Sequence, residues 1–250
     1  MSETRKGYIW RLVGRIVVLV TCAVICIAAP QWFEILEGFN FFRSLSPFHL
    51  LWLIWVCDMF YQIIPIKNKL PLGSMKLFSN RFRPIRDKIN YQALRDYVIT
   101  TTKAAYKVFI LWAALIIAIG LLHHYGIIND MILFMISVTF YVCDLICVLI
   151  WCPFRLIMKN RCCTTCRIFN WDHMMMFSPL VFVPGFFTWS LCAGAVIVLV
   201  IWEISFALHP ERFYEGTNEA LKCCNCTDRL CGERNCHAAI PSINNITKGI

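Results

Sequence analysis

Residues Met131–Pro153 read "MILFMISVTFYVCDLICVLIWCP", a long apolar run that contains one charged side chain, Asp144. About 20 apolar residues in an α-helix cross the roughly 30 Å hydrocarbon core of a bilayer. A helix satisfies its own backbone hydrogen bonds, which lipid cannot do for it. The run therefore predicts a transmembrane helix that carries a carboxylate inside the membrane.

Four other stretches have the same character. The five predicted helices lie near residues 12–30, 48–66, 104–123, 131–153 and 188–208. The composition agrees, because 59% hydrophobic and only 16% charged residues exclude an ordinary soluble domain. The first stretch ends in "CIAAP" and resembles a signal peptide, but cleavage before Pro30 is unfavourable, so we expect a retained helix. The sequence predicts an all-α integral membrane protein of about five transmembrane helices.

The distribution of basic residues predicts the orientation. Residues 67–103, between the second and third helices, contain nine Lys and Arg side chains and two Asp. Such loops stay in the cytoplasm, and the basic N-terminus agrees with that side. We therefore expect a cytoplasmic N-terminus, and anionic headgroups as partners of the basic loops. The net charge of +9 is then an orientation pattern, and no nucleic-acid partner is predicted. The part of the loop before the third helix is either a separate amphipathic helix or an extension of that helix.

A short motif occurs twice. "WVCDMFYQIIP" begins at Trp55 and "YVCDLICVLIWCP" begins at Tyr141, so each run places Val, Cys and Asp before a proline. This indicates two related helical hairpins plus one helix, with Asp58 and Asp144 at similar depths. Inserting one carboxylate at the membrane centre costs about 2.5–3.5 kcal/mol, so the pair predicts a proton or ion site. The alternative is a structural pair that fixes two helices together by hydrogen bonds.

The chain has fifteen cysteines, and five lie in "LKCCNCTDRLCGERNCHA", residues 221–238. The spacing C-x2-C-x4-C-x4-C supplies four thiolates for a zinc site, through Cys223, Cys226, Cys231 and Cys236. It resembles the zinc knuckle over these residues only, with Cys231 where that family has histidine. The knuckle's glycines are missing, so nucleic-acid binding is not implied. Iron–sulfur and copper are the alternative cofactors, and disulfides are expected if the tail lies outside the cell.

A second thiol motif, Cys163-x-x-Cys166, follows the fourth predicted helix. Arg161 and Arg167 flank it and favour thiolate, so it is either half of a metal site or a redox pair. His173 and three methionines follow closely, and this mixture of ligands suits copper as well as zinc.

The side of the tail depends on residues 177–208. One crossing by this stretch places the tail, residues 209–250, opposite the N-terminus, which is the arrangement we favour. Pro179, Pro184 and Gly185 interrupt its first part, so a re-entrant piece is the alternative. In either case we divide the chain into a membrane domain, residues 1–208, and a Cys-rich tail.

Two functions fit these patterns. The first is a membrane protein whose cysteines hold zinc, copper or iron–sulfur and handle electrons or soft metal. The alternative is a secondary transporter or channel in which Asp58 and Asp144 bind the ion, with structural cysteine clusters. Whether there is enzyme activity is left open, as is a second copy of the chain or another membrane protein as a partner.

The tail prediction can be tested by metal analysis of the purified full-length protein. We expect Cys223→Ser or Cys226→Ser to remove one metal ion per chain, because a four-thiolate site needs all its ligands. Cys224→Ser, the matched control, should leave the metal content unchanged. A tail that is disulfide-bonded in the native protein would contradict the metal site.

Overall fold

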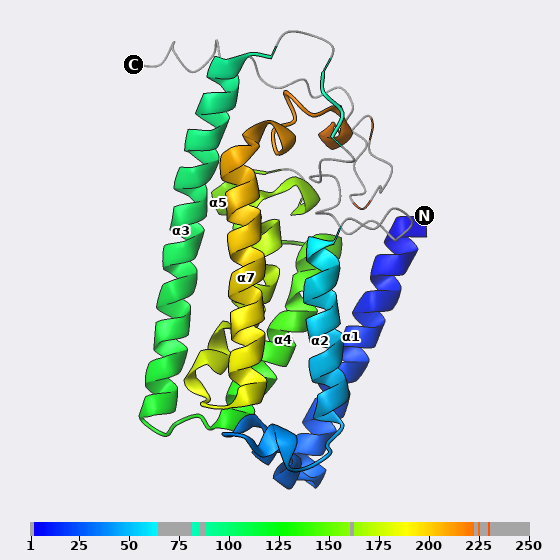
Figure 1. Ribbon diagram of the computed structural model, residues 1–250, viewed down its shortest axis with the longest axis vertical. Helices are drawn as coiled ribbons and strands as arrows, with labels where there is room; N and C mark the ends of the chain where they lie inside the picture. The colour runs from blue at the N-terminus through cyan, green and yellow to red at the C-terminus, as the bar shows by residue number, and fades with distance from the viewer. Residues whose placement is uncertain are drawn as a thin grey trace.

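The computed structural model describes residues 3–64, 82–85, 89–160, 163–222, 225 and 230, and within them the regular structure is helical. Five apolar helices form the frame (Figure 1): α1 (Glu3–Ala28), α2 (Phe48–Ile63), α3 (Tyr91–His124), α4 (Asp130–Leu149) and α7 (Phe186–Leu208). Four of them are long and apolar enough to cross a membrane, and α2 is shorter. The protein is an all-α integral membrane protein of about five such helices, as the sequence predicts.

Asparagine side chains start two of these helices. Asn90 Oδ1 accepts a hydrogen bond from the Ala93 backbone N–H at the start of α3, and Asn129 does the same for α4. Both satisfy an N–H group that has no partner within the helix. At 34 residues α3 is roughly 50 Å long, so it extends past the hydrocarbon core. The residues before the predicted third helix are therefore an extension of that helix, and the separate amphipathic helix is wrong.

A broken segment connects α4 to α7. It consists of α5 (Phe154–Met158), α6 (Asp172–Phe177) and the short 3-10 helices η5 (Cys163–Thr165), η6 (Arg167–Trp171) and η7 (Ser178–Phe182). Gly38, in the connection between α1 and α2, forms a bridge with Gly185. The segment therefore runs through the bundle to the end opposite the N-terminus before α7 begins (Figure 1).

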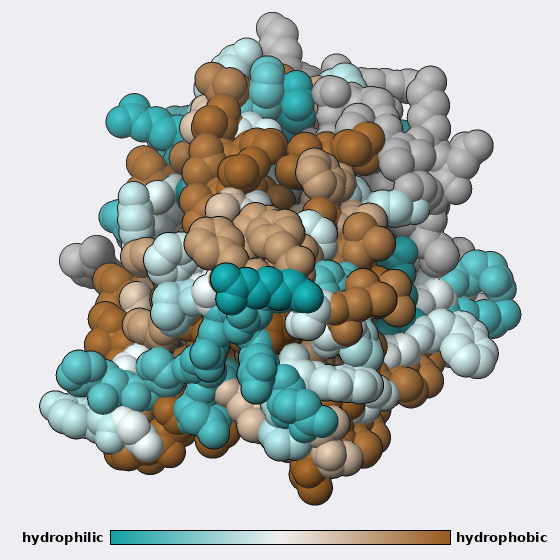
Figure 2. Space-filling view, turned by 60° about the horizontal axis from the view of Figure 1, so that its bottom comes forward, coloured by the Kyte–Doolittle hydropathy of each residue, from teal (hydrophilic) through white to brown (hydrophobic). Residues whose placement is uncertain are grey.

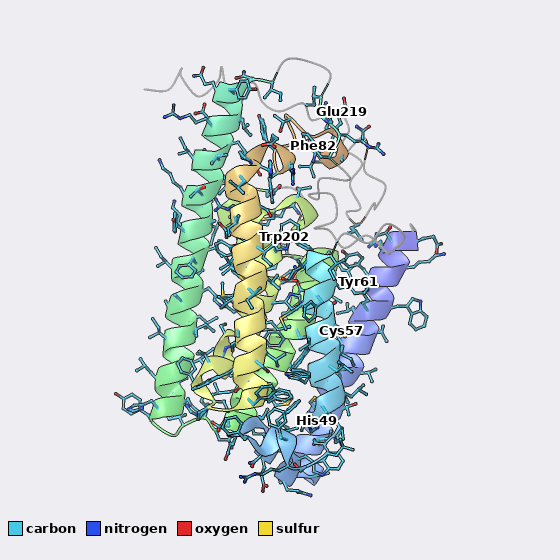
Figure 3. The ribbon with its side chains drawn as sticks, viewed as in Figure 1. His49, Cys57, Tyr61, Phe82, Trp202 and Glu219 are labelled. Carbon is cyan, nitrogen blue, oxygen red and sulfur yellow. The ribbon has the colours of Figure 1, made fainter. Side chains whose placement is uncertain are left out.

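Helix α7 then returns to the end of the bundle that carries the N-terminus. Asn218, after α7, bridges Pro84, before α3, and the Tyr97 hydroxyl of α3 donates to the Phe213 carbonyl at 2.9 Å. Phe82 and Glu219 accordingly lie together at that end in Figure 3. The expectation that the tail begins opposite the N-terminus is wrong, because the broken segment supplies a passage that apolar length alone does not reveal.

The packing does not follow the predicted hairpins. Helix α1 packs most extensively against α4, and α2 against α7. Aromatic rings fill the space between α2, α4 and the start of α7, where the Trp55 ring lies 5.1 Å from that of Phe177 and 5.9 Å from that of Phe134. All three side chains are buried, so this aromatic cluster is the centre of the core.

The outer surface of the bundle is apolar. Val17, Val20, Val24 and Ile27 of α1 are all more than half exposed. Figure 2 shows hydrophobic residues along the side of the molecule and hydrophilic residues gathered at the end nearest the viewer. A continuous apolar surface of this kind marks contact with a membrane, so the helices lie against the bilayer.

A half-buried ion pair attaches the broken segment to α7. Arg167 of η6 donates to Glu203 at 2.6 Å, and the Trp171 indole N–H donates to the same carboxylate at 2.9 Å. The Arg167 guanidinium also stacks 4.0 Å from the centre of the Phe206 ring. These contacts hold η6 in place, just before the residues that form the site described below.

The contact between Gly38 and Gly185 is close enough to predict a substitution effect. A Cβ at Gly185 would lie 1.9 Å from the Leu36 carbonyl oxygen, so Gly185→Ala forces the two connections apart. We expect a loss of about 1–3 kcal/mol, the usual cost of overpacking, seen as a lower midpoint of thermal unfolding in detergent. Gly14→Ala is the control, because a Cβ there meets nothing within 4 Å. An unchanged midpoint for Gly185→Ala would contradict the close contact.

Candidate functional site

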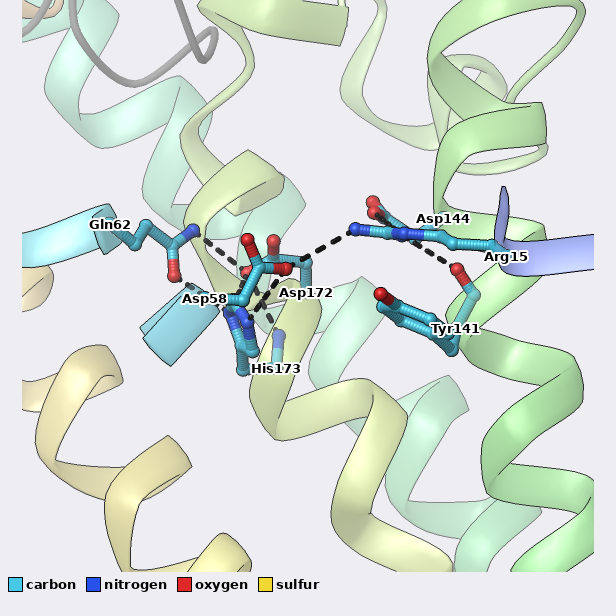
Figure 4. A network of polar contacts seen from close by, with 7 residues as sticks. All are labelled: Arg15, Asp58, Gln62, Tyr141, Asp144, Asp172 and His173. Atoms are coloured by element: carbon cyan, nitrogen blue, oxygen red, sulfur yellow. Dashed lines mark hydrogen bonds and ion pairs between the residues drawn. The ribbon is translucent and has the colours of Figure 1, made fainter. Parts of the chain in front are cut away.

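The two predicted carboxylates meet one arginine. Arg15 of α1 donates to Asp144 of α4 at 2.6 Å, and its second terminal nitrogen lies 3.5 Å from Asp58 of α2. Asp58 and Asp144 precede the last residues of their helices by the same number of positions, which confirms their similar depth. The ion pairs join three helices whose side chains approach from different directions (Figure 4).

Tyr141 holds the arginine in position. Its backbone carbonyl accepts a hydrogen bond from Arg15 at 2.6 Å, and the guanidinium lies 3.9 Å from the centre of its ring. Cation–π contact and ion pairing together fix the plane of the guanidinium. A basic residue near a helix end often extends to the lipid headgroups, but the Arg15 side chain is only 13% exposed. The two aspartates attract it into the bundle instead.

The broken segment adds two further charged groups. Asp172 and His173 begin α6, and Gln62 of α2 connects them: its amide N–H donates to Asp172 at 2.9 Å and its oxygen lies 2.8 Å from His173 Nδ1. His173 Nδ1 also lies 3.1 Å from Asp172, so both of its neighbours are acceptors and Nδ1 carries a hydrogen. The other ring nitrogen, Nε2, faces Asp58 at 3.8 Å.

Asp58 therefore connects two groups of charges, and we call the whole set the charged network, formed by Arg15, Asp58, Gln62, Tyr141, Asp144, Asp172 and His173 (Figure 4). A small cavity of about 30 Å³ lies beside it, and Arg11 contributes to the lining. A water molecule occupies roughly 10–15 Å³ of such space, so the cavity has room for about two.

The charges of the network, taken together with that of Arg11, nearly cancel. Three ionised carboxylates face two arginines, Arg11 and Arg15, which leaves one negative charge while His173 is neutral. One proton on His173 Nε2 makes the set neutral. Uncompensated charge is costly at membrane depth, so the arrangement favours the binding of one cation, and a proton on Nε2 fits the geometry.

Sequence reasoning found part of this network. By residue type the sequence offers four partners near the carboxylates, Tyr61, Gln62, Thr139 and Tyr141, and of these Gln62 and Tyr141 contact network members. Thr139, also expected there, is exposed and bonds instead to the Met135 carbonyl. Arg15 and Asp172 were not expected. The sequence held one indication of Arg15, since it is the basic residue nearest the uninterrupted part of the first apolar run.

The cysteines of the second thiol motif lie beside the same network. Cys163 and Cys166 line a cavity of about 220 Å³, which we call the thiol pocket. Three more cysteines line it, Cys143, Cys147 and Cys152, together with Asp144 and Asp172 of the charged network. The pocket and the network thus share two carboxylates, although the cysteines and aspartates come from separate parts of the sequence.

The structure describes the cysteines of one thiol motif but not those of the other, so metal binding is considered separately for each. Within the described residues, no group of three or more His, Cys, Asp or Glu side chains is placed to hold a metal ion. His173 bonds to Asp172 and Gln62 and does not join Cys163 and Cys166. The predicted tail ligands Cys223, Cys226, Cys231 and Cys236 lie outside the described residues, so that site stays a prediction.

Fold and site together define a polytopic α-helical membrane protein with a charged network inside its bundle. No known family model matches the chain. No curated protein and no solved structure matches it either. The arguments about function therefore rest on the geometry of the site.

Arg15 should be the most sensitive position for stability. Removing one partner of a buried ion pair leaves the other charge uncompensated, at a cost of roughly 3–5 kcal/mol. We expect Arg15→Gln to lower the unfolding midpoint in detergent and Asp144→Asn, added to it, to restore part of the loss. Arg43→Gln, in an exposed connection, should change stability by no more than about 0.5 kcal/mol. Equal effects at Arg15 and Arg43 would show that the ion pairs contribute nothing.

Proposed function

We propose that this protein is a proton-coupled membrane transporter or channel, with the charged network as its proton site. The observation that carries the proposal is the convergence of Asp58 and Asp144 on Arg15, beside Asp172 and His173. Ionisable groups inside membrane proteins are rare, face the interior and mark ion or proton pathways. Here they come from three membrane helices and from the broken segment.

The geometry supports one exchangeable proton. His173 Nδ1 is occupied by its hydrogen bonds to Asp172 and Gln62, so Nε2 is the nitrogen that gains and loses a proton. Its neighbour is Asp58, at 3.8 Å, and the small cavity provides space for water. Asp58 also lies within 3.5 Å of Arg15, so a change of charge at His173 alters the attraction between α2 and α1. Proton binding is thereby linked to helix position.

The broken segment supports transport as well. Non-helical backbone is tolerated at membrane depth where protein buries it or where it lines a water-filled cavity. Interrupted helices with charged groups at the break are characteristic of ion and substrate sites in transporters. In this chain α6 begins at Asp172, directly after the 3-10 helix η6, and both elements carry buried residues.

The orientation and the tail metal remain proposals too. The basic residues around 67–103 support a cytoplasmic N-terminus, and the tail then starts in the cytoplasm. A reducing compartment keeps thiols free, which supports zinc ligation through the tail cysteines over disulfides. In this proposal the tail site is structural and does not take part in transport.

The proton site can be tested with charge-displacement currents from proteoliposomes adsorbed to a supported membrane. A rapid pH step should give a transient current in the wild type, whereas Asp58→Asn and His173→Gln should abolish it. In Asp58→Asn the amide keeps the hydrogen-bonding shape of the acid but cannot ionise, so we expect this variant to fold. Helical content, from circular dichroism, and elution volume in size-exclusion chromatography show whether each variant is folded.

A matched pair of controls lies in the same chain. His123 Nε2 and a carboxylate oxygen of Asp130 lie 2.7 Å apart at the connection between α3 and α4, outside the network. We expect His123→Gln and Asp130→Asn to keep the current. Persistence of the current in Asp58→Asn, or its absence in the wild type, would overturn the proposal.

A further inference from the structure

Three thiols meet at one wall of the thiol pocket. Cys147 lies on the last turn of α4, Cys152 follows the helix, and Cys163 belongs to η5. Cys152 lines the pocket together with both other cysteines, and the Cys163 thiol donates a hydrogen bond to the Cys147 carbonyl oxygen at 3.3 Å. None of the three forms a disulfide bond in the structure. A disulfide needs its sulfurs at about 2.05 Å, and Cys147 and Cys152 line the same cavity at positions close together in the chain.

Cys152 has the character of a nucleophile. The side chains of Cys147 and Cys163 lie beside Cys152 and lower the pKa of its thiol. Donors around a sulfur stabilise the thiolate, which is the reactive form. Cys152 is half-buried, so a reactant in the pocket can reach it.

The remaining walls of the pocket show what kind of reactant fits. They are mainly aromatic and aliphatic, with Trp112, Phe140, Phe154 and Phe169 among the lining residues. Trp112 of α3 packs 5.0 Å from Phe140 of α4, so rings from two membrane helices form one side. Cys143 lines the pocket and is exposed on the surface of α4, so the pocket reaches the face that contacts lipid.

We propose that the thiol pocket is a dithiol–disulfide redox centre in which a lipid-soluble quinone oxidises Cys147 and Cys152. A flat apolar ring suits the aromatic walls, and a reactant dissolved in the bilayer reaches the pocket beside Cys143. This proposal is independent of proton transport by the charged network, since it rests on the thiols and the pocket walls.

The reaction balances without another reagent. Cys152 and Cys147 together lose two electrons and two protons as their sulfurs bond, and the quinone gains both to become a hydroquinone. Cys163 is a positioning residue, because its thiol donates a hydrogen bond to the Cys147 carbonyl oxygen and need not enter the disulfide. A reduced partner protein or thiol must later return electrons to the Cys147–Cys152 bond for turnover.

The test uses the reduced full-length protein in lipid nanodiscs, without oxygen, mixed with decyl-ubiquinone. We expect a Cys147–Cys152 disulfide and an equimolar amount of hydroquinone. Chymotrypsin cleaves after Trp151, between the two cysteines, so mass spectrometry should find their peptides joined until a reductant separates them. In the wild type, quinone should also protect Cys152 from alkylation by N-ethylmaleimide, a measurement that needs no variant.

Two substitutions separate this centre from other thiols. Cys152→Ser should abolish hydroquinone formation, whereas Cys192→Ser should leave it unchanged, because Cys192 on α7 lies close to the Phe177 carbonyl oxygen and does not line the pocket. Cysteines that stay reduced after quinone addition, or a disulfide that joins a different pair, would overturn the proposal. So would full hydroquinone formation by a correctly folded Cys152→Ser variant.

Discussion

The ion pairs of Arg15 with Asp144 and Asp58 are the constraint on which the bundle depends. Each of these charges is unfavourable at membrane depth by itself, so each requires the others to be close. Helices α1 and α4 consequently pack together although they are far apart in the chain. The stacked ring of Tyr141 fixes the guanidinium between them, and the aromatic cluster around Trp55 fills the space that remains.

The broken segment brings the two sites together. It passes through the bundle, presents Asp172 and His173 to the network, and contributes Cys163 and Cys166 to the thiol pocket. Asp144 and Asp172 line both cavities. The two proposed sites therefore share two carboxylates, and a change of protonation proposed for the network would alter the electrostatic field at the thiols.

Much of the fold could be predicted from the sequence, because crossing a membrane imposes a requirement that local composition meets. Each long apolar run corresponds to a helix, and the repeated Val-Cys-Asp motif placed Asp58 and Asp144 at matching depths. The partners of these aspartates were harder to predict. His173 follows the CxxC motif, so its residue type and position suggested a metal ligand. In the structure its ring nitrogens lie against Asp58 and Asp172 instead.

The sequence by itself determined that the protein is a helical membrane protein with acidic groups among its helices, since hydrophobic length and charge are local properties. Only the tertiary structure decided which basic side chain pairs with those acids, where the tail begins and which cysteines share a pocket. The passage from Phe154 to Gly185 shows the reason: it is short, interrupted and partly polar, and surrounding helices bury it. Burial of that kind satisfies its backbone through tertiary contacts, which no local pattern encodes.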